Sequence, residues 1–162
     1  MSSVKKPRQP RWPARIGNIR SVILTVTKLT AAEIAEIINP TYASFGFLRQ
    51  GVATVQQWTD CASAITVSLK IEDQGVVRGL REHLTSADLA LHAIAQRSQA
   101  NGAWKQSPLW WHEIDSIQTA LDLHKFQMQH LSAREYHGAI RAAAVEVFAQ
   151  GGTVYHPERL AA

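Results

Sequence analysis

Hydrophobic residues recur at steps of three and four along most of this chain, which is the spacing of α-helices that bury one face. The first long stripe comprises Val55, Trp58, Ala62, Ile65 and Leu69. The second comprises Val77, Leu80, Leu84, Ala87, Leu91 and Ile94. The third comprises Trp110, Ile114, Ile117, Leu121, His124, Met128 and Leu131. Such stripes are typical of helices that pack nearly antiparallel to one another.

Helix-capping signals divide the chain between these stripes. Capping boxes at Thr30–Glu33, Thr54–Gln57 and Ser132–Glu135 each predict the start of a helix. Ser107-Pro108 predicts a fourth start, because serine caps well and proline fits the first helical position. Glycines that follow the stripes predict the helix ends. These are Gly51, Gly75, Gly102 and the pair Gly151-Gly152.

The pattern predicts an all-α fold, an antiparallel helical bundle of about five helices with a flexible N-terminal arm. Residues 1–20 form the arm, residues 21–152 the bundle and residues 153–162 a C-terminal tail. The main helices are expected near 54–73, 76–100, 108–131 and 133–150. Because the connections are short, helices adjacent in sequence are expected to pack against each other.

Residues 31–51 can be interpreted in two ways. Asn39-Pro40 is expected to kink the segment or divide it into two short helices, because proline lacks an N–H. The segment also resembles a helix-turn-helix, but its second helix offers only Arg49 and Gln50 as base-reading side chains. We therefore favour bundle helices over a DNA-reading motif.

Residues 16–28 are ambiguous between a strand and a short helix. Their β-branched residues suit a strand, but the one candidate partner strand is the brief Thr153-Val154-Tyr155. We favour a short helix.

The first twenty residues carry all of the chain's excess positive charge. They contain no acidic residue and six basic ones, namely Lys5, Lys6, Arg8, Arg11, Arg15 and Arg20. The whole chain has 17 basic and 13 acidic residues, so 11 basic and 13 acidic residues remain beyond the arm. Three prolines add to this composition, which is typical of a segment that stays extended until an anionic partner binds it. The six basic residues are the candidate nucleic-acid-binding residues.

The overall composition is that of one ordinary globular domain. The chain has 162 residues, of which 46% are hydrophobic and 19% charged. Its single cysteine, Cys61, lies in an apolar helical pattern and is interpreted as a buried hydrophobe. No apolar run approaches the ~18 residues of a membrane span, and residues 22–24 are too short for a secretory signal. We expect a cytoplasmic protein with no membrane partner.

No motif indicates an enzyme, a metal site or a cofactor site. The chain lacks phosphate-binding glycine loops and a nucleophile motif. Asp88 and His92 share a helix face, which suits a solvated pair better than half of a metal site. His124 lies on an apolar stripe and is interpreted as a core histidine, with a functional role as the alternative.

Four tryptophans form the candidate interaction surface. Trp104, Trp110 and Trp111 crowd one corner of the predicted bundle, and Trp12 belongs to the arm. Because adjacent helical residues point about 100° apart, Trp110 and Trp111 cannot both face the core. The corner is either a small satellite core or a hot spot for a protein partner.

Three stretches resemble a group of small uncharacterised bacterial proteins associated with prophages and mobile elements. They are residues 71–84 (IEDQGVVRGLREHL), 102–104 (GAW) and 121–127 (LDLHKFQ), and the resemblance extends from Leu29 to about Gly152. Some members of that group are labelled as Fis-like transcriptional regulators. The resemblance implies a bacterial cytoplasm and contact with host nucleic-acid machinery. The Fis-like label also implies a C-terminal helix-turn-helix, for which residues 133–162 offer no convincing pattern.

Two functions from different classes fit these features. In the first, the protein is a nucleic-acid-associated accessory or regulatory protein, whose arm binds phosphates and whose bundle can self-associate as a homo-oligomer. In the second, it is a protein-interaction module, such as an inhibitor of a host or defence complex, whose arm binds an acidic protein surface.

Overall fold

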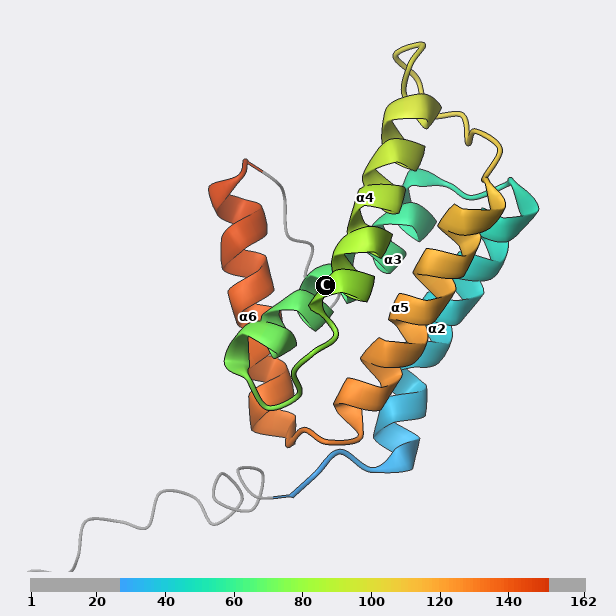
Figure 1. Cartoon of the computed structure of the whole chain (residues 1–162). Coiled ribbons are helices and arrows are strands. Elements are labelled where there is room, and N and C mark those ends of the chain that lie inside the picture. The colour runs from blue at the N-terminus through green and yellow to red at the C-terminus, as the bar shows by residue number, and fades with distance from the viewer. Residues whose placement is uncertain (1–26, 152–162) are drawn as a thin grey trace, which may run out of the picture.

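The computed structural model describes residues 27–151, which fold into five α-helices (Figure 1). These helices are α2 (Ala31–Gln50), α3 (Val55–Gln74), α4 (Arg81–Ser98), α5 (Trp111–Met128) and α6 (Ala133–Ala149). The all-α prediction is confirmed. Within the described residues there is no strand, but Lys28 and Ser132 form an isolated antiparallel bridge. None of the five helices combines the length and the apolar character needed to cross a membrane.

Several predicted features fall outside residues 27–151. The arm with its six basic residues and Trp12, most of the ambiguous segment 16–28, and the tail 153–162 are among them. They remain predictions from the sequence.

The three predicted capping boxes are present and begin α2, α3 and α6. At the start of α2, the Thr30 hydroxyl accepts from the Glu33 backbone N–H at 3.3 Å, and Glu33 accepts from the Thr30 N–H at 2.8 Å. The same reciprocal pair forms in the other two boxes. At the end of α2, Gly51 adopts φ +78°, a left-handed conformation that glycine tolerates without strain.

Of the two alternatives for Pro40, a kink or a division into two short helices, the division is wrong, because α2 runs as one helix from Ala31 to Gln50 and ends at Gly51 as predicted. Pro40 is exposed, so the carbonyl that it leaves without a helical donor can face water. Buried contacts on both sides of it, from Ile38 and Phe45, hold the helix together. With no turn inside α2, a helix-turn-helix at this position is excluded.

Two predicted helix starts lie too early in the sequence. The second stripe was expected to be helical from residue 76, but α4 begins at Arg81. Gly79 has φ +90°, and the Glu72 carboxylate accepts from the Gly79 N–H at 2.8 Å, so this connection is a structured loop. Ser107-Pro108 does not begin α5 either, since this helix starts at Trp111.

The central helix of the bundle is α3, and each of the other four described helices packs against it. Figure 1 shows α2, α4 and α6 running opposite to α3. The helices α4 and α5 are also antiparallel to each other. The expectation that sequential helices pack together fails at α6, which lies on α3 and away from α5. A narrow seam of Tyr136, Ala139 and Ala143 is the buried side of α6.

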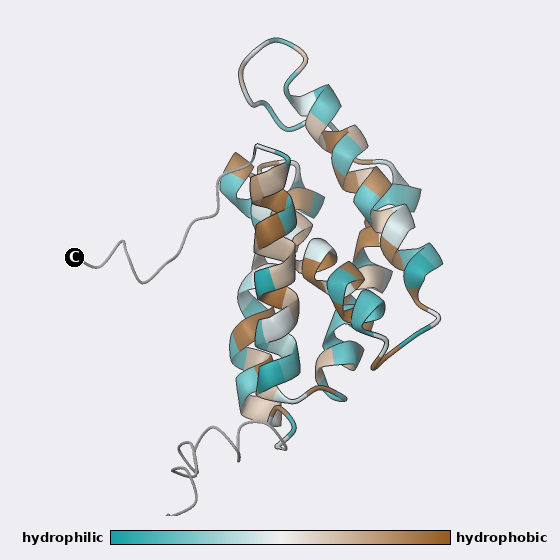
Figure 2. Ribbon diagram, turned by 90° about the vertical axis from the view of Figure 1, so that its left-hand side faces the viewer, coloured by the Kyte–Doolittle hydropathy of each residue, from teal (hydrophilic) through white to brown (hydrophobic). Residues whose placement is uncertain are grey.

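The core has two parts that meet along α3. The larger part joins α2, α3, α4 and α5, and its largest buried residues include Leu48, Ile65, Leu91, Ile94 and Leu121. The smaller part joins the start of α2 and the end of α5 to α6, and it includes Ile38, Ile71, Met128, Leu131 and Tyr136. Figure 2 shows hydrophobic and hydrophilic residues interleaved along every helix, which fits helices that bury one face.

The core predicts a clear contrast between two leucines of α4. Leu91 is fully buried, whereas Leu89 is 65% exposed. We expect Leu91→Ala to lower the free energy of unfolding by about 2–5 kcal/mol, because it removes buried methyl groups and leaves a cavity. Leu89→Ala should change it by less than about 0.5 kcal/mol. Urea unfolding followed by circular dichroism measures both, and equal effects would contradict the packing of α4.

Candidate functional site

The end of the bundle where α5 begins carries two exposed tryptophans. Trp110 is 59% exposed and Trp111 is 79% exposed, the largest exposed fraction among the large hydrophobic side chains of the described residues. Trp110 is extended, with φ −89° and ψ 151°, and Trp111 is the first residue of α5. Both indoles therefore lie at the surface, and neither belongs to a satellite core.

Glu113 fixes the position of Trp110. Its carboxylate is only 3% exposed and accepts from the Trp110 backbone N–H at 2.9 Å, which caps α5. The same Oε2 atom accepts from Arg97 Nη2 at 2.8 Å. The Arg97 guanidinium lies 5.7 Å from the centroid of the Trp110 ring, within the range of a cation–π contact. Arg97 thus lies over Trp110 while most of the indole stays exposed.

His112 lies edge-on to both exposed tryptophans. Its ring centroid is 5.4 Å from Trp110 at an interplanar angle of 83°, and 5.8 Å from Trp111 at 88°. Such edge-to-face contacts favour defined ring orientations over free rotation. Both exposed rings therefore contact His112, and Trp110 is also covered by Arg97.

Trp104 lies apart from this pair and is half-buried. Its indole N–H donates to the Ala53 carbonyl at 2.8 Å, and its ring is 6.1 Å from Trp58. This position fits the satellite-core interpretation. Gln106 adds a second attachment, since it accepts from the Ala53 N–H at 2.5 Å and donates to the Leu48 carbonyl at 2.6 Å. These bonds fasten the α4–α5 connection to the α2–α3 connection.

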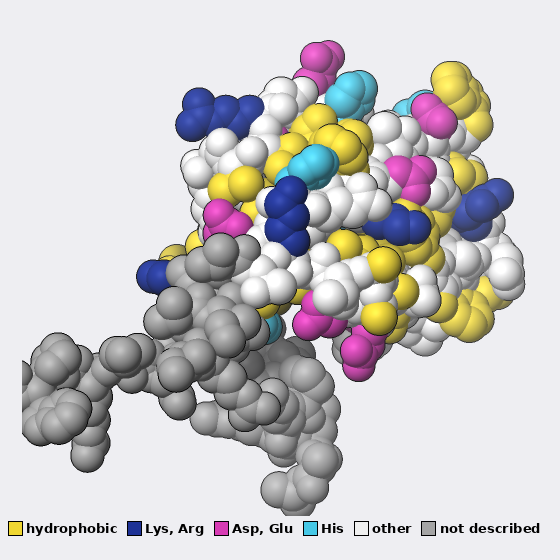
Figure 3. All heavy atoms as spheres, turned by 90° about the horizontal axis from the view of Figure 1, so that it is seen from below, with side chains coloured by type: hydrophobic (Ala, Val, Ile, Leu, Met, Phe, Trp, Pro, Cys, Tyr) yellow, Lys and Arg dark blue, Asp and Glu magenta, His cyan; other side chains and the backbone are white. Residues whose placement is uncertain are grey.

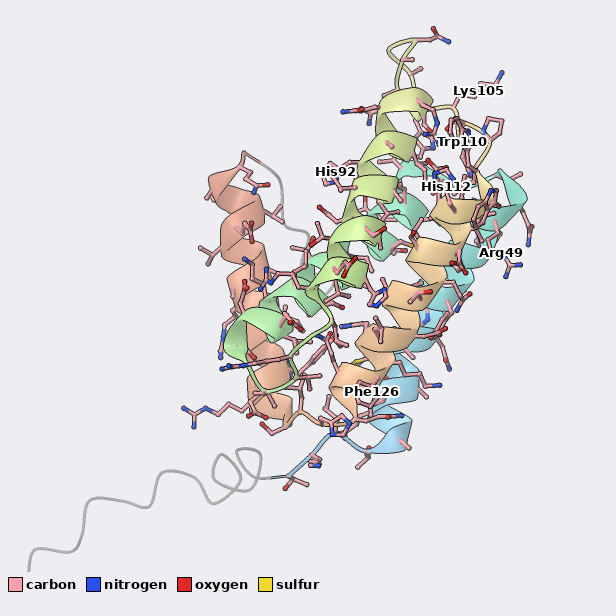
Figure 4. The ribbon with its side chains drawn as sticks, in the orientation of Figure 1. Arg49, His92, Lys105, Trp110, His112 and Phe126 are labelled. Atoms are coloured by element: carbon pink, nitrogen blue, oxygen red, sulfur yellow. The ribbon has the colours of Figure 1, made fainter. Side chains whose placement is uncertain are left out.

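The segments fastened together in this way define the tryptophan end, residues 47–57 and 95–114. They contain three basic residues, Arg49, Arg97 and Lys105, and one acidic residue, Glu113. Because Glu113 is buried and paired with Arg97, the exposed charges within these residues are positive, and the exposed carboxylate of Asp115 lies one residue beyond them. Figure 4 shows Lys105, Trp110, His112 and Arg49 following one another along one edge of the bundle.

The opposite end of the bundle holds the first described residues, 27–30. The Leu29 N–H donates to the Leu131 carbonyl at 3.0 Å, beside the bridge between Lys28 and Ser132. Figure 3 shows basic and acidic side chains interspersed over the visible part of this end. Since α2 has 20 residues, about 30 Å of helix separates Leu29 from the tryptophan end.

His124 is buried in the core, as the sequence predicted. It is 1% exposed, and its Nδ1 lies 2.6 Å from the Ser68 hydroxyl. Ser68 also lies 2.9 Å from the Ala64 carbonyl, to which its single proton is donated. Both contacts are satisfied when the neutral His124 ring donates from Nδ1. Burial lowers the pKa of His124 to about 4, partly opposed by the neighbouring Gln127.

Two further groups singled out from the sequence are the Asp88–His92 pair and Cys61. Asp88 and His92 form an exposed side-chain contact at 3.6 Å, as expected for a solvated pair. Cys61 is fully buried, and burial raises the pKa of its thiol to about 12, so the thiolate is disfavoured. Among residues 27–151, no group of three or more His, Cys, Asp or Glu side chains is placed to hold a metal ion.

No protein-family model matches the chain, and no curated protein or solved structure matches it either. The resemblance to prophage-associated bacterial proteins is not tested by these comparisons and remains an expectation from the sequence.

The capping role of Glu113 can be tested with a nearby carboxylate as control. Glu113→Ala should lower the free energy of unfolding by about 2–3 kcal/mol, because it removes a cap and a charge-assisted hydrogen bond. Asp115→Ala removes an exposed carboxylate of the same helix and should have an effect below about 0.5 kcal/mol. Equal effects in chemical unfolding would show that Glu113 does not organise this end.

Burial of His124 predicts a pH dependence of stability. Its folded pKa of about 4 lies below the unfolded value near 6.5, so only the unfolded chain takes up this proton between those values. The stabilisation is complete above pH 6.5 and falls by up to about 3 kcal/mol as the pH approaches 4. Tyr136, which faces the ring at 6.1 Å, stays neutral because burial raises its pKa to about 12.

His124→Leu is the matched variant for this measurement. It should keep the fold, since Ser68 still donates to Ala64, and it should remove the loss of stability between pH 6.5 and 4. Unfolding in urea across that range measures the effect. An unchanged pH profile in the variant would show that another group causes the dependence.

Proposed function

We propose that this protein is a nucleic-acid-associated accessory or regulatory protein that binds phosphates through its arm and uses the tryptophan end as a second contact. The observation that supports this most directly is the composition of the tryptophan end. Two exposed indoles lie there among cations, and the one carboxylate of these residues is buried and paired. Aromatic rings beside positive charge suit a ligand that has both flat bases and phosphates.

The distribution of charge over the bundle supports the same proposal. Between residues 27 and 151 the chain has ten basic and twelve acidic residues, a net negative body. Three of those ten basic residues and one of those twelve acidic residues lie at the tryptophan end. A nucleic acid would be repelled by most of the bundle surface and attracted to this end and to the arm.

A protein-interaction module is the second candidate, and a specific observation supports it. The tryptophan end also exposes Val52 and Val55, and exposed apolar side chains around tryptophans are typical of protein-binding hot spots. In this alternative the apolar side chains bind a protein partner, such as a host or defence complex, and the arm binds an acidic surface on it.

Salt dependence is the test of the proposed function. Binding of duplex DNA should weaken with salt along a logarithmic slope of at most about −5 from six arm cations, and near −3 if only some of them reach phosphates. Replacing Lys5, Lys6, Arg8 and Arg11 by alanine should reduce that slope to less than half and weaken every sequence alike. The control replaces Arg134 and Arg141, exposed on α6, and should bind as the wild type does.

The unmodified protein decides between the two candidates. If it has no affinity at low salt for duplex DNA, single strands or structured RNA, the nucleic-acid proposal is wrong. Capture of a defined protein by the wild type, and its loss on replacing Trp111 and Val52, would then support the interaction module.

A further inference from the structure

We infer that the tryptophan end binds single-stranded nucleic acid, with unpaired bases stacked on Trp111 and Trp110 and the flanking phosphates near Lys105 and Arg49. This inference rests on the proposed function and goes beyond it, because the arm alone would bind single strands and duplexes through phosphates without distinguishing them.

The exposure of the two indoles is the first observation that supports stacking. Trp111 is 79% exposed, so its ring is open to a planar ligand. Trp110 is covered by Arg97 and stays 59% exposed, so it is supported by a cation while much of its surface is free. A stacking surface needs this combination of support and exposure, because an indole fixed beforehand loses little freedom when a base binds.

The base must be unpaired to use such a surface. Inside a duplex both faces of every base are covered by its neighbours, so stacking on a side chain requires the strand to be open. Proteins that bind single strands commonly combine exposed aromatic rings with a positively charged track, and every base offers a ring face. The tryptophan end therefore favours single strands without a marked sequence preference.

The positions of the cations are the second observation, and they support contacts with phosphates. Figure 4 shows Lys105 on one side of Trp110 and His112, and Arg49 on the other. Lys105 and Arg49 are both exposed, and neither has an ion pair within the described residues. Arg97 is paired with Glu113, so Lys105 and Arg49 are the cations of this end without an ion pair, and the Arg49 guanidinium lies 5.9 Å from the centroid of the Phe45 ring. A strand crossing the rings would have its backbone near one or both of them.

The test uses the full chain at low salt with three fluorescently labelled probes: oligo(dT), oligo(U) and a blunt duplex of equal length. Trp111→Ala should weaken binding of both single strands by roughly 5- to 100-fold, since stacking contributes ~1–3 kcal/mol per base and ~1.4 kcal/mol is tenfold. It should change duplex binding by less than about twofold. The matched control is Phe148→Ala on α6, which removes an equally exposed aromatic ring (73%) and should leave all three affinities unchanged.

Conservative variants separate stacking from general apolar contact. Trp111→Phe keeps a flat ring and should retain most of the single-strand affinity, whereas Trp111→Leu should lose it as Trp111→Ala does. Intrinsic tryptophan fluorescence of the wild type should be quenched by oligo(dT), with less quenching in Trp111→Ala. Replacing Arg49 and Lys105 together should reduce the salt slope for single strands by about 1.4, at ~0.7 for each neutralised phosphate.

The outcomes distinguish this inference from the proposed function. If single strands and duplex bind with a steep salt slope and Trp111→Ala changes neither, the arm binds nucleic acid and the stacking inference is overturned. If Trp111→Leu and Trp111→Phe bind equally well, the rings act as apolar surface and the inference is again overturned. If no probe binds the wild type at low salt, the proposed function fails, and the inference with it.

Discussion

The fold depends on one constraint: α3 packs against each of the other four described helices. Between Gln57 and Glu72 only Ser63 is exposed, so the polar groups on the buried side of that stretch need a partner in the protein. Thr66 and Ser68 meet the requirement within α3, because their hydroxyls donate to the carbonyls four residues earlier. Trp58 does so across the bundle, by donating to the Leu91 carbonyl at 2.9 Å. Small residues such as Cys61 and Ala64 let the neighbouring helices approach.

The burial of α3 leaves the ends of the bundle as the places where unusual side chains can be exposed. Inside, His124 is kept neutral by the same crowding that requires Ser68 to be hydrogen-bonded twice. At the end where α5 begins, Glu113 binds Arg97 and the Trp110 N–H together, which uses one buried carboxylate to cap a helix and to hold a cation against an exposed ring. Removal of that carboxylate would release both the Arg97 guanidinium and the Trp110 N–H, so a buried group organises the exposed surface of the tryptophan end.

The sequence predicted what is decided locally and failed where distant segments meet. Each capping box lies within four consecutive residues, so Thr30–Glu33 and its two counterparts could be predicted directly. The start of α5 was missed because Glu113 caps a tryptophan, and no serine or threonine marks the position. The packing of α6 on α3 was missed because a hydrophobic stripe shows which face of a helix is buried but not which helix covers it. The exposure of Trp110 and Trp111 follows from their position at the start of α5, but Arg49 lies far from Arg97 and Lys105 in the sequence, and only the fold brings it to the same end.

The continuity of α2 fixes the distance between the two ends of the bundle. Had Pro40 divided this segment, Leu29 and Arg49 would be joined by a hinge, and their separation could vary. Because α2 is one helix held by Ile38 and Phe45 on either side of the proline, Leu29 and the cation at Arg49 are kept at a fixed distance. In the proposed function, a ligand at the tryptophan end would therefore lie at a set distance from Leu29. The net negative charge of the described residues would disfavour phosphates elsewhere on the bundle.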